Sequence, residues 1–165
     1  MDFEDTEAEA ALRAEVRSFL SANAELKTGT DADWSRGAVA EAPESQAEYL
    51  RRCRAWQATL AEHGWACITW PREWGGRGGT PAVSIIFGQE AAAYDVSTGF
   101  IGAAQQLVGP ALMRHGSDEQ KARWIPPLVR GDELWCQLFS EPGAGSDLAA
   151  LSTRAERDGE QWVVT

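Results

Sequence analysis

A short stretch from Trp135 to Asp147, WCQLFSEPGAGSD, combines residue types suited to holding a phosphorylated ligand. The apolar run from Leu134 to Phe139 predicts a buried strand, and the Gly- and Pro-rich residues that follow predict a turn. Successive backbone N–H groups in such a turn can point into one concavity and bind a phosphate. The hydroxyls of Ser140 and Ser146 can donate hydrogen bonds to an oxygen or a ring nitrogen of the ligand.

The same residues are also compatible with an ordinary surface turn in which Asp147 caps the next element. No Gly-Lys-Ser/Thr follows, so the stretch is not a Walker loop, and its glycines lack the G-x-G-x-x-G spacing of a dinucleotide-binding turn. Residue types alone therefore leave a binding turn and a structural turn open.

From Gln137 to Ser146 the stretch resembles the flavin-binding signature of the acyl-CoA dehydrogenase family. In that signature a strand leads into a hydroxyl residue and then Glu-Pro-x-x-Gly-Ser-Asp. The sequence from His115 to Asp147 is similar to one continuous run of the family, and Trp70–Gly76 resembles its W-P-x-x-x-G-G loop. The resemblance thus extends well beyond one motif.

The resemblance implies an FAD cofactor and α,β-dehydrogenation of an acyl-CoA thioester, a β-oxidation step of lipid metabolism. Acyl-CoA oxidases and flavin-dependent monooxygenases share the fold and much of the motif, so they stay open. Many members carry an aromatic residue where this chain has Gln137, which puts stacking at that position in doubt. The cofactor contacts that the resemblance implies are Gln137, Leu138, Phe139, Ser140, Gly145 and Ser146, with Ser146 also near the acyl-CoA.

The resemblance covers only the front portion of the family's chain. It implies an N-terminal helical domain over 1–132 and the beginning of a β-barrel domain, incomplete, over 133–165. The family's catalytic Glu comes from a later helical bundle, so we assign no catalytic residue here and interpret Glu141 as part of the turn. Full-length members form homo- or hetero-oligomers. An alternative is a non-catalytic, truncated or partner polypeptide that docks on a complete subunit, and an unpaired sheet edge would make the chain poorly stable alone.

Composition excludes several other classes of protein. With 165 residues, 44% hydrophobic and 24% charged, the chain is typical of a soluble globular domain. The net charge of −10 argues against a nucleic-acid partner, and no apolar run is long enough for a membrane span. The acidic N-terminus is no secretory signal. Three widely spaced cysteines and two isolated histidines indicate no metal site, and predict buried free thiols in a reducing compartment, the cytoplasm.

Apolar spacing predicts a mainly α fold whose five helices precede the β segment. The third helix is apolar on most sides and should be buried, and Pro126-Pro127 should shorten or bend the fifth. A hairpin with its turn at Asp158-Gly159 should follow the binding stretch. The predicted helices begin at Asp5 or Thr6, at Glu44 or Ser45, after Thr80, near Thr98, and at the Ser117 capping box.

The loop from Gly64 to Gly79 holds three tryptophans and is rich in glycine. We interpret it as a tight loop pinned by Trp65, Trp70 and Trp74, with a substrate-facing lid as the alternative. Glu90, the one acid inside the third helix, is interpreted as a paired structural residue and not as a base.

Overall fold

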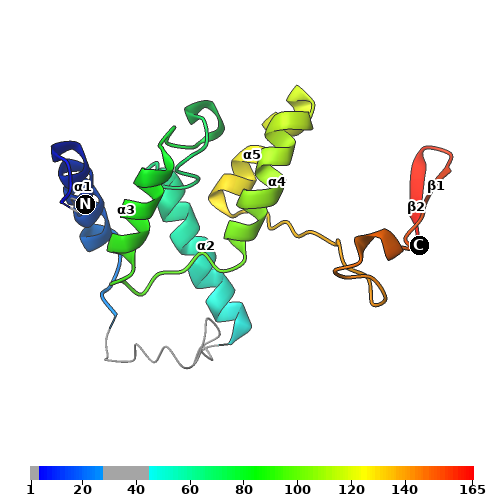
Figure 1. The fold of residues 1–165 in the computed structure, drawn as a ribbon, viewed down its shortest axis with the longest axis horizontal. Helices are drawn as coiled ribbons and strands as arrows, with labels where there is room; N and C mark the ends of the chain where they lie inside the picture. The colour runs from blue at the N-terminus through cyan, green and yellow to red at the C-terminus, as the bar shows by residue number, and fades with distance from the viewer. Residues whose placement is uncertain (1–3, 28–44) are drawn as a thin grey trace. The chain divides into compact units, whose positions relative to one another are not determined.

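The computed structural model describes residues 4–27 and 45–165. It divides into two compact units, Met1–Trp135 and Cys136–Thr165, which are considered separately below. The first unit is helical and the second carries a two-stranded hairpin (Figure 1). The predicted mainly α fold class is therefore confirmed.

The described residues of the first unit contain five α-helices: α1 Glu7–Asn23, α2 Gln46–Glu62, α3 Pro81–Ala91, α4 Ile101–His115 and α5 Asp118–Arg130. Each of α1, α2 and α5 begins at a capping box, because the hydroxyl of Thr6, Ser45 or Ser117 accepts the backbone N–H three residues on. The carboxylate or amide oxygen of that third residue accepts the cap's own N–H. These starts agree with the predictions to within a residue.

The core of the helical unit is built from one face of each helix. Val16 and Leu20 of α1 and Ile125 of α5 are fully buried. Helix α1 packs against α3, α5 packs against both α4 and α2, and α2 also touches α4 (Figure 1). The apolar stripes that predicted α1 and α2 are thus the faces these helices bury.

The loop between α2 and α3 is fixed by aromatic side chains and close backbone contacts. Trp65 and Trp70 are buried, and Arg72–Trp74 forms the short helix η2. A Cβ on Gly109 of α4 would lie 2.0 Å from the Trp70 indole, so only glycine fits beneath that ring. The Arg77 guanidinium lies 3.8 Å from the centroid of the Trp65 ring. The prediction of a loop pinned by tryptophans is confirmed.

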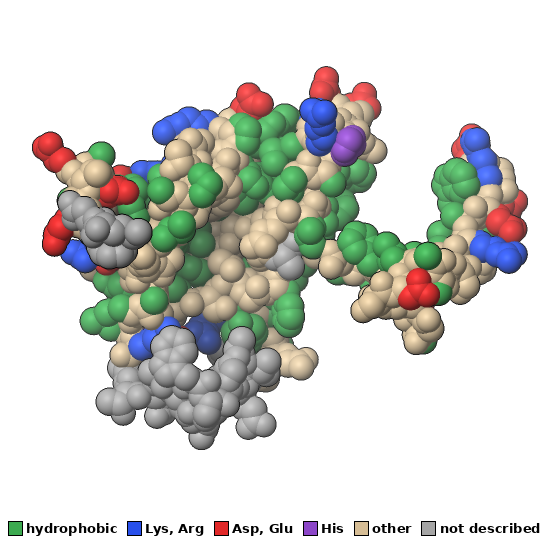
Figure 2. Space-filling view, viewed as in Figure 1, with side chains coloured by type: hydrophobic (Ala, Val, Ile, Leu, Met, Phe, Trp, Pro, Cys, Tyr) green, Lys and Arg blue, Asp and Glu red, His purple; other side chains and the backbone are tan. Residues whose placement is uncertain are grey.

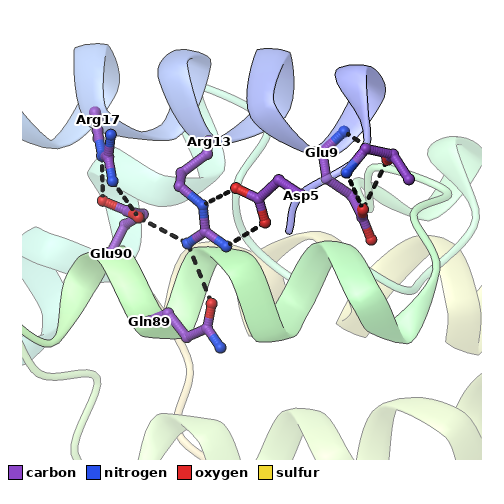
Figure 3. A network of polar contacts seen from close by, with 7 residues as sticks. Asp5, Glu9, Arg13, Arg17, Gln89 and Glu90 are labelled. Carbon is purple, nitrogen blue, oxygen red and sulfur yellow. Dashed lines mark hydrogen bonds and ion pairs between the residues drawn. The ribbon is translucent and has the colours of Figure 1, made fainter. Parts of the chain in front are cut away.

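A polar network joins α1 to α3 (Figure 3). The Glu90 carboxylate accepts from Arg17 Nε at 2.6 Å and from Arg13 Nη1 at 2.8 Å, and Arg13 Nε also reaches Asp5 at 2.8 Å. The hydrogen bonds from Arg17 and then Arg13 hold the pKa of Glu90 below its ordinary value. Glu90 is a paired structural residue, as expected.

Three predictions for the helical unit are wrong in detail. Helix α3 is not buried on most sides, because it packs mainly against α1 and leaves Ile85 exposed. The helical spacing of apolar residues in α4 predicts that Leu107 and Ala111 face inward, but both side chains are exposed. Pro126 and Pro127 do not shorten α5, since burial of its apolar face offsets their lost hydrogen bonds, and the alternative that they bend the helix stays a prediction. The helix runs on to Gly131, which takes φ 76° at its C-cap.

The second unit contains a short helix, η3 Leu148–Ala150, and an antiparallel hairpin of β1 Ala155–Asp158 and β2 Gln161–Val164. Its turn is Gly159-Glu160, one residue later than predicted. The expected buried strand over Leu134–Phe139 is absent, because no described segment pairs with it. For the same reason Cys136 is exposed; Cys67 is only partly covered, so the prediction of buried thiols holds for Cys53 alone.

Candidate functional site

A cavity of about 660 Å³ opens within the helical unit. Aromatic and aliphatic side chains from α2, α3 and the tryptophan loop line it, among them Leu60, Trp70 and Phe87. Helix α4 contributes Gly102, Gln105, Gln106 and Pro110, and Thr98 lines the cavity from the segment before this helix. None of these described lining residues is acidic, so the cavity offers hydrogen-bonding groups but no carboxylate base.

Two glutamines on this wall hold the C-terminal end of α5. Gln57 Nε2 donates to the Val129 carbonyl at 2.6 Å, and Gln105 Nε2 lies 3.4 Å from the carbonyl oxygens of both Leu128 and Val129. Gln57 is only 1% exposed, and its Oε1 has no partner among the described residues. Gly131 N already donates to the Leu128 carbonyl, so the two side-chain amides mainly satisfy the carbonyl of Val129 at the end of the helix.

Cys67 lines the same cavity in an unusual backbone conformation. Its φ is 46°, in the left-handed region that residues with a Cβ rarely adopt. Burial raises the pKa of its thiol to about 12. The thiol is therefore protonated at neutral pH and is a poor nucleophile.

The stretch predicted to bind a cofactor lies in the second unit, where its side chains are open to solvent. Leu138 is 90% exposed and Phe139 63% exposed. Across residues 4–27 and 45–165, the backbone N–H and C=O groups of Leu138, Phe139 and Ser140 find no hydrogen-bond partner. Three consecutive residues thus present backbone donors and acceptors that no described group of the chain engages.

A tight turn follows this segment. Glu141 N donates to the Ala144 carbonyl at 2.8 Å, and Ala144 N donates back to Glu141 at 3.1 Å. A Cβ placed on Gly143 or Gly145 would meet nothing within 4 Å, so the space beside both glycines is open. Ser140 and Ser146 flank the turn with exposed hydroxyls.

The side chain of Glu141 is fully occupied by the chain itself. It accepts four hydrogen bonds from the backbone N–H and hydroxyl groups of Ser152 and Thr153. These bonds, led by that of the Thr153 hydroxyl, lower the pKa of Glu141 to about 2. A carboxylate held so firmly in its anionic form is a weak base, which agrees with its interpretation as part of the turn.

Apolar side chains gather at the surface of the second unit (Figure 2). Ala144 is the only one of residues 136–165, all of which the structure describes, that is buried. The exposed large apolar residues there are Leu138, Phe139, Leu148, Leu151, Trp162, Val163 and Val164. Surfaces of this kind mark places where another polypeptide or a ligand packs.

Comparison with known proteins identifies the family to which this chain belongs. The family described as acyl-CoA dehydrogenase, N-terminal domain, matches residues 6–132. The chain belongs to the acyl-CoA dehydrogenase family.

Among curated proteins, the chain is similar to acyl-CoA dehydrogenase IpdE1 of Mycobacterium tuberculosis. The two are 43% identical over 122 residues, which are 74% of this chain and 32% of that protein. The chain thus spans about a third of the length of this relative.

Solved structures agree. The ChsE4–ChsE5 complex of Mycobacterium tuberculosis matches 99% of this chain and 38% of its own, at 33% identity and a TM-score of 0.68. A Tcur3481–Tcur3483 steroid acyl-CoA dehydrogenase matches at 32% identity and a TM-score of 0.65, covering 99% of this chain and 39% of its own. A glutaryl-CoA dehydrogenase of Mycobacterium smegmatis in complex with FADH2 shares the fold, at 22% identity and a TM-score of 0.61, covering 97% of this chain and 38% of its own.

Sequence reasoning missed the cavity and the two glutamines on its wall. A polar residue beside Trp56 on the inward face of α2 was the available signal for Gln57. Gln105 lies one turn after the buried Ile101 of α4, on the same face.

None of the described helices is long and apolar enough to cross a membrane, and no cluster of potential metal ligands occurs in the described ranges.

Proposed function

We propose that this protein carries the front portion of a flavin-dependent acyl-CoA dehydrogenase, and that Gln137–Ser146 forms one wall of its FAD site. The observation that supports the proposal is the run of free backbone groups at Leu138, Phe139 and Ser140, followed by an open glycine turn. FAD, when bound, supplies the hydride acceptor for α,β-dehydrogenation of an acyl-CoA thioester.

The six residues proposed to contact the cofactor each have a task. The backbone of Leu138 and Phe139 hydrogen-bonds the polar edge of the isoalloxazine ring, and the Ser140 hydroxyl donates to a ring heteroatom. Gly145 leaves room for the pyrophosphate, and the Ser146 N–H and hydroxyl donate to its oxygens or to the acyl-CoA. Gln137 begins the segment and contributes backbone contacts.

The cavity of the helical unit is the proposed place for the acyl group. Its volume lies within the range of small-molecule sites, and its lining is aromatic and aliphatic with a few amides. The absence of a carboxylate among its described lining residues fits a base supplied from outside this chain. From the family to which the chain belongs, the proposed substrate is an acyl thioester, the proposed reaction belongs to β-oxidation, and the proposed compartment is the cytoplasm.

A second candidate is a non-catalytic subunit that docks on a complete partner. Exposed Leu138, Trp162 and Val164 favour it, because apolar side chains at a surface are commonly covered by a partner. The ChsE4–ChsE5 structure shows that a related protein forms a complex of two different chains. We propose that this protein likewise works in a homo- or hetero-oligomer.

Titration of the chain with FAD, followed by the visible flavin absorbance, tests the proposal. Saturable binding is expected, with Ser140→Ala weakening it by about fivefold through loss of one hydrogen bond. Ser18→Ala, which removes an exposed hydroxyl from α1, is the matched control and should leave binding unchanged. A wild-type chain that does not perturb the flavin spectrum would overturn the proposed FAD site, while its family membership would stand.

A further inference from the structure

The carboxylate of Glu141 accepts four hydrogen bonds, more than any other side chain in the second unit. Its Oε2 accepts from Ser152 N and Ser152 Oγ, both at 2.9 Å. Its Oε1 accepts from Thr153 N at 2.7 Å and from the Thr153 hydroxyl. Each carboxylate oxygen therefore binds the backbone and the hydroxyl of one residue, which is charge-assisted and geometrically specific.

These bonds connect two parts of the unit that are distant in sequence. The backbone of Glu141 closes the turn with Ala144, while its side chain reaches the residues just before β1. Arg154 N donates to the Thr165 carbonyl at 2.8 Å, which extends the hairpin to the residue after Thr153. Glu141 thus joins the turn to the hairpin, with Ser146 inside the loop and Ser140 next to it.

Little else holds this loop. Of residues 136–165 only Ala144 is buried, so apolar packing within the unit contributes little. An amide in place of the carboxylate would present its NH2 group to the backbone N–H of either Ser152 or Thr153. Because both groups are donors, that hydrogen bond would be lost. A carboxylate one methylene shorter would not span the same gap. The position therefore specifically requires Glu.

We propose that Glu141 is the positioning residue of the flavin-binding segment: its carboxylate holds the 141–153 loop closed and so places Ser140 and Ser146 for contact with FAD. This inference rests on the proposed FAD site. The strongly lowered pKa of Glu141 agrees with it, since the anion persists throughout the neutral range. Glu141 touches no ligand itself and acts through the residues it fixes.

The test compares Glu141→Gln with Glu160→Gln, which removes an equivalent charge from the exposed hairpin turn. Two properties are measured on the full chain: the dissociation constant for FAD from the perturbed flavin band, and hydrogen exchange at the amides of Ser152 and Thr153. Glu141→Gln should weaken FAD binding about tenfold and accelerate exchange at these amides by about as much. Glu160→Gln should change neither.

Thr153→Val keeps the carboxylate and removes one hydroxyl donor, so it should weaken FAD binding by a smaller factor. A larger loss of FAD affinity in Glu141→Gln than in Thr153→Val, with an unchanged helical circular-dichroism signal, distinguishes a positioning role from unfolding. Wild-type affinity in Glu141→Gln would overturn the inference and leave the proposed FAD site intact. A wild-type chain that binds no FAD would overturn both, and the amide exchange would then show whether Glu141 still closes the loop.

Discussion

Each of the two units of this chain is stabilised by a different kind of interaction. In the helical unit, Val16, Leu20 and Ile125 are fully buried, and five helices cover a common core. In the second unit one alanine is buried, and the structure depends on the hairpin ladder, the turn at Glu141 and the four bonds to its carboxylate. One unit is stabilised by burial of apolar surface and the other by directional hydrogen bonds.

The difference fits the separate tasks that we propose for the two units. A packed core tolerates few changes and gives a rigid wall, which suits a cavity for an acyl group. In the second unit, some backbone groups have no partner among the described residues, and large apolar side chains are exposed. Such a surface suits the binding of a cofactor or a partner protein. Perturbing each unit with the same chemical change tests this contrast.

The largest difference is expected for one substitution made in both units. Val16→Ala removes methyl groups from a fully buried site, whereas Val164→Ala removes them from a side chain that is 65% exposed. Val16→Ala should destabilise the helical unit by about 2 kcal/mol, and Val164→Ala should stay within about 0.5 kcal/mol. Denaturant unfolding followed by circular dichroism measures both. Equal effects would show that the second unit has a core of its own.

A second pair of substitutions tests the packing beneath Trp70. Gly109→Ala places a methyl 2.0 Å from the indole ring, so the ring or α4 must shift, at a cost of about 1–3 kcal/mol. Gly88→Ala in α3 is the matched control, because its Cβ would meet nothing within 4 Å. In a helix the control should be neutral or stabilise by up to about 1 kcal/mol. The melting temperatures of the two variants should therefore move apart.

The structure also shows which of its features could be predicted from the sequence. Local signals were reliable: the capping boxes at Thr6, Ser45 and Ser117 and the apolar stripe of α1 depend only on neighbouring residues. The hairpin was predicted within one residue, because a glycine turn between two β-prone segments is also local.

Features that depend on distant partners were not predictable in the same way. Whether Leu134–Phe139 forms a strand depends on a neighbour to pair with, and none lies within the described residues. The apolar composition of α3 gave no sign of which face α1 would cover. The cavity was missed because residues from four separate segments create it. The flavin-contact residues 137–140, 145 and 146 remain predictions.

The ion pairs between α1 and α3 should have a moderate effect. Glu90→Gln removes the acceptor of both Arg13 and Arg17 and should cost about 1 kcal/mol, less at high salt. Since the pKa of Glu90 is lowered on folding, its contribution is complete above its ordinary value of 4.5 and is lost as pH falls below it. Glu15→Gln, at a more exposed pair with Arg77, should cost less. Unfolding at low and high salt distinguishes the two.

The smallest expected effect on stability is that of protonating the Glu141 carboxylate. Its pKa of about 2 results first from the Thr153 hydroxyl, then from the backbone and hydroxyl donors of Ser152 and Thr153. Because folding lowers this pKa from 4.5, the carboxylate stabilises the loop fully above pH 4.5 and loses that effect as pH falls towards 2. The side-chain carboxyl carbon shift, followed by NMR, gives the midpoint directly.

Thr153→Val should raise the pKa of Glu141, since it removes the hydrogen bond that lowers it most. Ser146→Ala is the control: it removes a hydroxyl from the same loop that makes no contact with the carboxylate. An unchanged midpoint in Thr153→Val would mean that the backbone N–H groups and the Ser152 hydroxyl hold the carboxylate without the Thr153 hydroxyl. The second unit would then depend more on its backbone than on the Glu141–Thr153 side-chain pair, and the contrast with the helical unit would be larger.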